Sequence, residues 1–311
     1  MRLIRNPDHL ARLWVLCLAA AALVAACGDD DTTAPPGGGA PPASPKASFV
    51  DCWVEGLEYT TDTASGLTGE FGIFACALGD SVAFHVGDIA LGNGVAGPYM
   101  NPIEIAYATD IFEYEPTNIA RFLLTIDDDG DPSNGMQIVA AVRAAAVGKT
   151  LDFDQYPGTF AADANVQQVI SDLTAVTTAG TRPLVGETIA RTHLTFTLFA
   201  VLAGLYGGPF TGSKGGDDWE GRWFLQVAAN GDIIGEFSPD MAATVVMSGI
   251  MQPSGSFSCM DQTGMGLMFT GRIVRGEDGL HDVTGAWTDY EQGSGTFSGD
   301  RPHYPDEIVC P

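Results

Sequence analysis

The sharpest chemical feature of the sequence is an acidic loop that places four carboxylates within five residues and a side-chain amide shortly after them. These charges repel one another unless a cation or solvent neutralises them. Calcium takes about six to eight oxygen ligands, and aspartates that alternate with backbone carbonyls in a glycine-containing loop supply such ligands. Calcium is therefore the cofactor that the loop predicts, with the expected ligands Asp127, Asp129, Asp131 and Asn134.

The loop departs from an EF-hand at two positions. Pro132 stands where that motif needs a glycine, and Ile138 stands where its bidentate glutamate would be. The alternative is a solvated acidic turn that caps the next helix, where a nearby aspartate contributes ~0.3–1 kcal/mol of stability. The sequence leaves calcium binding and the acidic turn equally open.

Tryptophans in the C-terminal part of the chain form a second candidate site. If Trp219, Trp223 and Trp287 line one face of a sheet, they would hold a sugar or an apolar ligand. Aromatic side chains of small barrels more often form the core, so a packing role is the alternative.

The sequence shows no constellation of residues that is typical of an enzyme. His193 lies on an apolar segment and would act as a general base only with a nucleophile beside it. The chain contains no GxSxG motif, no HExxH motif and no closely spaced pair of histidines. Neither a serine hydrolase nor a zinc site is therefore expected. We predict no catalytic residue and favour a non-enzymatic role, with an enzymatic one left open.

The N-terminus has the pattern of a secretory signal. Three arginines precede an apolar run from residue 13 to residue 26, which is shorter than the ~18–20 residues that a membrane-spanning helix needs. The run ends in Val24-Ala25-Ala26-Cys27, which resembles the bacterial lipobox. That resemblance implies cleavage before Cys27 and acylation of Cys27, so that the membrane becomes a partner through the acylated cysteine. An uncleaved membrane anchor is the alternative.

The residue after the expected cleavage site bears on location. Gly28, in place of an aspartate, favours an outer-membrane lipoprotein by the same resemblance, with a body that is periplasmic or surface-exposed. The formal net charge of −25 would repel nucleic-acid phosphates, so no nucleic-acid partner is expected. Charged residues make up 17% of the chain and apolar residues 45%, which indicates a globular protein rather than a disordered acidic one.

Four cysteines remain beyond the expected signal and the lipidated residue. Their even number suits disulfide formation in an oxidising compartment. Three connectivities are possible, and we favour the pairs Cys52–Cys76 and Cys259–Cys310 because each closes a loop within one half of the chain. A four-cysteine metal site is disfavoured, because the sequence has no CxxC pair.

Periodicity predicts an α+β protein that is mainly β. Residues 1–26 form the signal, and residues 27–47 form a disordered linker rich in proline and glycine. Residues 48–115 alternate with period two and predict a sandwich-like β module. Residues 116–206 show helical spacing around the acidic loop. Residues 207–311 contain short strands and turn signals such as Asn230-Gly231, which predict an antiparallel meander or small barrel.

Three stretches resemble a widespread group of uncharacterised secreted bacterial lipoproteins. They include Gly56-Leu57-Glu58-Tyr59-Thr60-Thr61, then Asn118-Ile119-Ala120-Arg121-Phe122 with the acidic loop, and finally Ala190-Arg191-Thr192-His193-Leu194. The resemblance implies architecture and location and carries no settled activity. The first stretch also resembles prealbumin-like sandwich modules of surface proteins, which are usually structural.

Together these observations predict a lipid-anchored cell-envelope protein with a non-enzymatic binding, adhesion or structural role, which calcium would stabilise if it binds the acidic loop. A β-barrel lipoprotein that binds a small ligand or a glycan is the alternative, and an envelope hydrolase is a third hypothesis. The sequence does not identify the protein or glycan partner.

Overall fold

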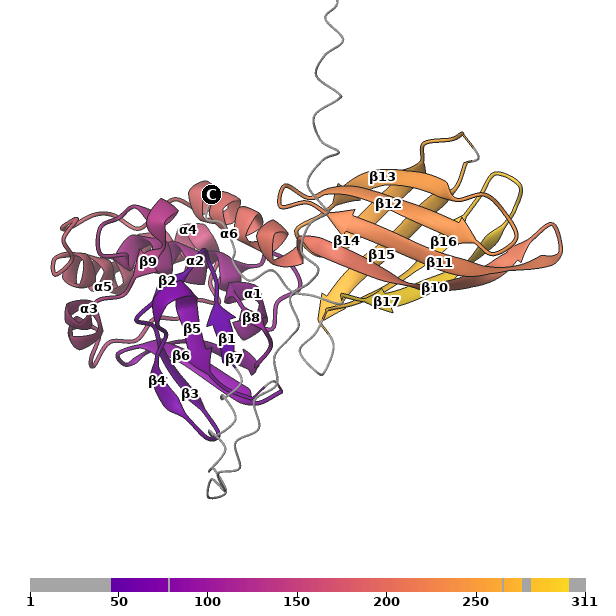
Figure 1. The fold of residues 1–311 in the computed structure, drawn as a ribbon. Helices are drawn as coiled ribbons and strands as arrows, with labels where there is room; N and C mark the ends of the chain where they lie inside the picture. Colours follow the sequence, from indigo (N-terminus) through magenta and orange to yellow (C-terminus); the bar gives the residue numbers. More distant parts are fainter. Residues whose placement is uncertain (1–45, 78, 265, 276–280, 302–311) are drawn as a thin grey trace, which may run out of the picture. The chain divides into compact units, whose positions relative to one another are not determined.

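The structure is a computed structural model that describes residues 46–301 except residues 78, 265 and 276–280. It is an α+β protein, mainly β, in which the helices lie between two β regions in chain order (Figure 1). This is the predicted fold class. Among the described residues, no helix is both long enough and apolar enough to cross a membrane.

The first β region contains three small sheets. One has the strand order β5-β1-β8, with β1 at Lys46–Phe49, β5 at Ile73–Ala75 and β8 at Tyr99–Met100. Another has the order β4-β3-β6-β7, with β3 at Glu58–Thr61, β4 at Ser65–Leu67, β6 at Ser81–Val86 and β7 at Ile89–Val95. The third pairs β2 (Val54–Glu55) in parallel with β9 (Met136–Gln137).

Aromatic rings join the first two of these sheets. Phe84 of β6 lies with its ring centroid 4.7 Å from that of Phe49 in β1 and 5.2 Å from that of Phe74 in β5. The ring of Phe84 is oriented inwards because successive side chains of a strand point to opposite faces. Its neighbours Val82 and Val86 at the same period are buried with it. The predicted sandwich-like module is therefore confirmed.

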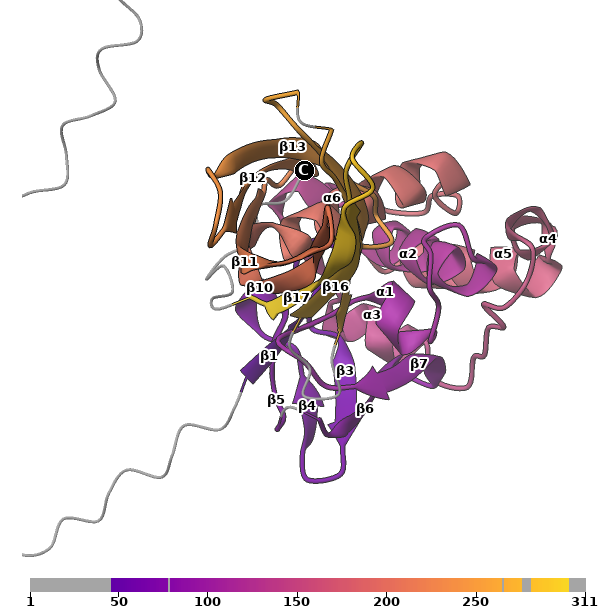
Figure 2. The same cartoon turned by 90° about the vertical axis from the view of Figure 1, so that its right-hand side faces the viewer.

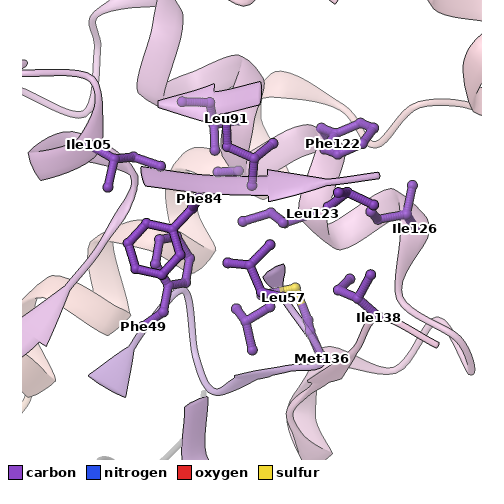
Figure 3. Close-up of a cluster of buried hydrophobic side chains, with 14 of the residues drawn as sticks. Phe49, Leu57, Phe84, Leu91, Ile105, Phe122, Leu123, Ile126, Met136 and Ile138 are labelled. Atoms are coloured by element: carbon purple, nitrogen blue, oxygen red, sulfur yellow. The ribbon is translucent and has the colours of Figure 1, made fainter. Parts of the chain in front are cut away.

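The α-helices follow β8 in chain order. They are α1 (Pro102–Ile105), α2 (Tyr114–Ile126), α3 (Ala140–Ala145), α4 (Pro157–Ala162), α5 (Ala164–Thr174) and α6 (Glu187–Leu202), with short 3-10 turns η1 (Glu70–Gly72) and η2 (Pro132–Asn134). Strand β9 lies between α2 and α3. Figure 3 shows that Phe122, Leu123 and Ile126 of α2 share one cluster with Phe84 and Leu57 of the β module. The predicted boundary at residue 115 therefore marks a change from strands to helices, and residues on both sides of it pack into one core.

Helix α2 begins earlier than the sequence suggested. Thr117 and Asn118 have side chains that suit an N-cap, but the helix starts before them, at Tyr114, with Pro116 in its first turn. A proline is tolerated there because the first N–H groups of a helix have no partner within the helix. Asn118 instead lies inside the fold, where its Nδ2 donates to the carbonyls of Phe153 and Gln155.

Two other parts of the predicted helical region 116–206 contain strands. The segment from Met136 begins as strand β9, and the helix that follows it, α3, is only six residues long. Helix α6 ends at Leu202 rather than near Tyr206, because Tyr206 belongs to the next strand and its hydroxyl donates to the carbonyl of Leu202 at 2.8 Å. That bond satisfies one of the carbonyl groups left free at the end of a helix.

The second β region is a closed, antiparallel, eight-stranded barrel, which Figure 2 shows as a ring of strands. Each strand pairs with the next along the chain, and β17 pairs with β10 to close the ring, with Phe210 opposite Phe297. The strands are β10 (Gly204–Lys214), β11 (Asp217–Val227), β12 (Asp232–Pro239), β13 (Val245–Met251), β14 (Ser256–Asp261), β15 (Met268–Arg275), β16 (His281–Thr288) and β17 (Ser294–Asp300). The predicted meander or small barrel is confirmed in its closed form.

Glycines make room for the rings inside the barrel. A Cβ built on Gly285 or Gly271 would overlap the ring of Phe297, and one built on Gly221 would overlap the ring of Phe210. The pairs Thr270-Gly271 and Thr284-Gly285 both lie inside strands in regular pairing. The threonine points outwards while the glycine lets an aromatic ring of a nearby strand cover the backbone.

Neither of the two expected disulfides is formed, since Cys76 and Cys259 are both buried thiols. Cys76 follows Ala75, which pairs with Lys46 at the start of β1, whereas Cys52 lies beyond the end of that strand. Cys76 and Cys52 therefore lie near opposite ends of β1. A strand of this length spans about 13 Å, at ~3.3 Å per residue. A disulfide needs Cα atoms within ~7 Å.

Cys259 lies at an inward-facing position of β14 and is fully buried in the barrel core. Its surroundings are apolar, and burial raises the pKa of its thiol to about 12. The inward direction of this side chain places the thiol in the barrel core, where it forms no disulfide, so the expected pair with Cys310 is not formed. Cys310 itself lies outside the described residues.

Candidate functional site

The acidic loop begins with a buried aspartate. Asp127 follows α2 directly and is fully buried; its Oδ1 accepts a hydrogen bond from the backbone N–H of Gln137 at 2.8 Å. Its Oδ2 has no hydrogen-bond partner among the described residues. Burial raises the pKa of Asp127 to about 6, against the opposing hydrogen bond from Gln137, and the charge of Asp129 raises it further.

The other three expected ligands fold the loop onto itself. Asp129 accepts from the N–H of Asp131 at 2.9 Å and from Nδ2 of Asn134 at 2.8 Å. Asp131 accepts from the N–H of Ser133 and so caps the short helix η2. The hydrogen bonds from Asn134 and Asp131 lower the pKa of Asp129. These bonds are those of a capped acidic turn, the second of the two interpretations that the sequence left open.

The loop is also tied to a segment 50 residues further along the chain. Asp128 accepts from the backbone N–H of Thr178 at 3.0 Å, and Arg182 donates from Nε to the carbonyl of Thr125 at 2.8 Å. A further Arg182 nitrogen donates to the carbonyl of Asp127. These contacts were not evident from the sequence, because Thr178 and Arg182 lie in an irregular segment after α5.

Within the described residues, no three or more His, Cys, Asp and Glu side chains are grouped so that they could hold a metal ion. Calcium binding through Asp127, Asp129, Asp131 and Asn134 stays a prediction. The fully buried Asp127 is the one member of the set with a buried oxygen that lacks a hydrogen bond in the described part of the chain.

The tryptophans predicted as a ligand site belong to the barrel and its core. Trp223 and Trp287 are almost wholly buried, while Trp219 is partly buried and packs on the same cluster. The indole N–H of Trp223 donates to the carbonyls of Pro209 and Ser298 at 3.1 Å each, and that of Trp287 donates to the carbonyl of Thr211 at 3.2 Å. Buried indoles that are satisfied by the barrel wall indicate a packing role. A ligand-binding role for these residues stays a prediction that this position disfavours.

Aromatic rings occupy the interior of the barrel. The rings of Phe210 and Phe237 are stacked with centroids 3.7 Å apart, and Phe237 lies 4.6 Å from Phe269. Phe269 in turn lies 5.4 Å from Phe297, which contacts Trp223 at 5.2 Å. The barrel interior therefore contains a continuous chain of aromatic contacts across the strands.

Trp219 is covered by a charged cluster. The ammonium group of Lys214 lies 5.0 Å from the centre of the Trp219 ring and forms ion pairs with Asp289 at 2.8 Å and Glu291 at 3.0 Å. The hydrogen bond to Asp289 is the main reason that the pKa of Lys214 is raised. The apolar stem of a lysine can cover a ring while its charge stays paired, so this tryptophan already has an intramolecular partner.

His193, the candidate general base, has an acidic partner that the sequence did not reveal. Its Nδ1 lies 3.0 Å from Oδ1 of Asp51, which is fully buried in the turn after β1. The nearby hydroxyl of Thr197 accepts from the N–H of Cys52 and donates to the carbonyl of His193. That hydroxyl is therefore used by the backbone, and the arrangement is a buried ion pair that joins the turn to α6.

No protein-family model matches this chain, and no curated protein matches it. The geometry of its own residues is therefore what bears on its function. Cys27, the expected lipidation site, lies outside the described residues.

Proposed function

We propose that this chain is a lipid-anchored cell-envelope protein that binds a partner through the outer surface of its barrel, without catalysing a reaction. The observation that carries the proposal is the aromatic core of the barrel, in which rings such as Phe210, Phe237 and Trp287 contact one another. A barrel filled by its own side chains offers its outer surface and its ends for binding. A ligand held at its centre is therefore disfavoured.

The outer surface carries an apolar patch that suits such a role. We define the outer apolar patch as the outward side chains Phe224, Ile234, Val246, Ile250 and Met260, each between 45% and 65% exposed. They come from the four consecutive strands β11 to β14. Exposed apolar side chains that gather in one place, rimmed by polar ones, are typical of an interaction surface.

Strand register makes the patch continuous. Ile234 pairs with Ser248, so that Val246 and Ile250 are its diagonal neighbours on the same face. Met260 also pairs with Ser248, from the other side, and is diagonal to the same two residues. Diagonal neighbours lie about 7–8 Å apart, within reach of long side chains. A surface groove of about 580 Å³, lined by Ile250 and Met260, runs over β13 and β14.

The anchor is supported by the sequence alone. The lipobox-like ending at Cys27 and the proline- and glycine-rich stretch after it favour a tethered body at a membrane surface. Tethering would keep the outer apolar patch close to envelope partners, because a short flexible linker raises the effective concentration of what it joins.

Site-specific photo-crosslinking in living cells tests the proposal. A photoactivatable residue at Ile234 should give a discrete adduct with a partner molecule, because this position is the centre of the patch. The matched control is Thr284, which is exposed on the outer face of β16, where it pairs with Ser298. No adduct at Ile234, or the same adducts from both positions, would contradict binding through the outer apolar patch.

A further inference from the structure

A second surface site lies in the α+β part of the chain, between the end of α1 and the start of α2. A cavity of about 640 Å³ opens there. Five of its lining residues give it its character, namely the aromatic residues Phe112 and Tyr114 and the acidic residues Asp110, Glu115 and Asp154. This volume falls in the range of about 300–1,000 Å³ that is typical of small-molecule sites.

The aromatic rings of this cavity are unusually open to solvent. Phe112 is 60% exposed and Tyr114 is 47% exposed, although both rings are large and apolar. Tyr114 is held in place by an edge contact with Tyr156, whose ring centroid is 5.8 Å away. The face of an aromatic ring carries negative charge density, so an exposed ring can attract a cation.

One of these rings already binds a cation of the protein itself. The guanidinium carbon of Arg191 lies 5.1 Å from the centre of the Phe112 ring, and the same side chain donates to the Phe112 carbonyl. Arg191 is neutralised by an ion pair with Glu187, one helical turn before it in α6. The charge of Arg191 is therefore used, and it does not balance the carboxylates of the cavity.

Two of those carboxylates, Glu115 and Asp154, lie close enough for their charges to interact. Burial raises the pKa of Glu115, and the charges of Asp154 and Asp152 raise it further. Within the part of the chain that the structure describes, no ion pair with Lys, Arg or His involves Asp110, Glu115 or Asp154. Two acidic side chains of the cavity accept backbone hydrogen bonds: Glu113 accepts from the N–H groups of Thr109 and Asp110, and Asp110 accepts from the N–H of Phe112 at 3.0 Å.

We infer that this cavity binds a small organic polycation of the linear polyamine class. Its ammonium groups would pair with the carboxylates of Asp110, Glu115 and Asp154, and its methylene chain would lie on the rings of Phe112 and Tyr114. Charge complementarity selects a cation, and the rings select an organic one, because calcium and magnesium coordinate oxygen atoms and gain nothing from an aromatic face. This site is separate from the outer apolar patch and does not depend on the proposed function.

Calorimetric titration of spermidine into the full mature chain in detergent, at about 150 mM salt, tests the inference. Glu115→Gln removes one carboxylate without changing size, and Tyr114→Leu removes one ring. Each variant should weaken binding about tenfold, the effect of losing one cation–π or charge contact of ~1.4 kcal/mol. Tyr114→Phe keeps the ring and should keep the affinity, which separates loss of the ring from a disturbed fold.

The matched control is Glu236→Gln, which removes the same charge from an exposed position of β12 on the barrel. Its affinity for spermidine should equal that of the unmodified chain. An equal loss in Glu236→Gln and Glu115→Gln would show general attraction to an acidic protein and would overturn the inference. Absence of binding to the unmodified chain would overturn it too, as would calcium binding with the same dependence on Tyr114.

Discussion

Asp51 and His193 are joined by a buried ion pair that fixes the turn after β1 to helix α6. Burial lowers the pKa of His193, but the hydrogen bond and the charge of Asp51 outweigh burial, so that the pKa is raised above its ordinary value. Oδ2 of Asp51 and Nε2 of His193 have no hydrogen-bond partner among the described residues. Each partner therefore depends on the other, and loss of one leaves a buried charge without compensation.

The stability of the fold should depend on pH through His193. Because the folded-state pKa is raised, the contribution of the pair is fully present below the unfolded pKa of 6.5 and is lost as pH rises through the folded-state pKa. His193→Gln should lower the free energy of unfolding by about 3–5 kcal/mol at pH 6, and by less at alkaline pH.

Urea unfolding between pH 5.5 and pH 9 would check this dependence. His85→Gln is the matched control. His85 also has an acidic neighbour, with its Nδ1 3.6 Å from Oε2 of Glu58, but it is only half-buried. The free energy of unfolding should differ less between the unmodified chain and His193→Gln as pH rises. A difference that does not shrink would contradict the assigned role of the ion pair.

At the scale of elements, the local pattern of apolar and turn-forming residues predicted strands and helices well. The turn at Asn230-Gly231 joins β11 and β12 as the sequence predicted, with Trp223 opposite Phe237. The helical spacing from Ile119 to Ile126 correctly marked a core helix. The sequence left open whether the C-terminal strands form an open meander or a closed barrel, because closure pairs β10 with β17, which lie far apart in sequence.

The same limit explains the contacts that sequence reasoning missed. Asp51 pairs with a histidine that lies 142 positions away, and Arg182 reaches the acidic loop from an irregular segment. Neither contact leaves a periodic signal. The ring of Phe297 covers Gly285 and Gly271 inside the barrel, which depends on strand register rather than on either local sequence.

Gly285 should be intolerant of any side chain. Gly285→Ala would place a methyl group against the Phe297 ring and the Thr270 carbonyl, so that one of the strands must shift. We expect the free energy of unfolding to fall by about 1–3 kcal/mol, the usual cost of overpacking a core. Tryptophan fluorescence during denaturant unfolding would report it, because Trp219, Trp223 and Trp287 all belong to the barrel.

Gly69→Ala is the control for this substitution. A Cβ at Gly69 would have its nearest neighbour, the Ile73 carbonyl oxygen, at 3.8 Å, and its backbone φ of −93° suits any residue. Equal stability of Gly285→Ala and the unmodified chain would show that the barrel interior has free space, which would contradict a core filled by aromatic rings.

At the scale of the whole molecule, the chain combines a mixed α+β core with a separate barrel core and a strongly acidic composition. A net charge of −25 would keep such a body apart from anionic surfaces. The apolar side chains that remain exposed on β11 to β14 then stand out on an acidic chain. An acyl anchor with a flexible tether would hold this body at the envelope without requiring affinity for lipid head groups.

The most direct test of the proposed lipid anchor is the intact mass and membrane fractionation of the protein made in a bacterial cell. We predict a mature chain that begins at Cys27, carries the mass of its acyl groups and separates with the outer membrane, whereas Cys27→Ser should stay uncleaved and unacylated. A mature chain without acyl mass, or one that begins at another residue and is recovered in the soluble fraction, would contradict the lipid-anchored function.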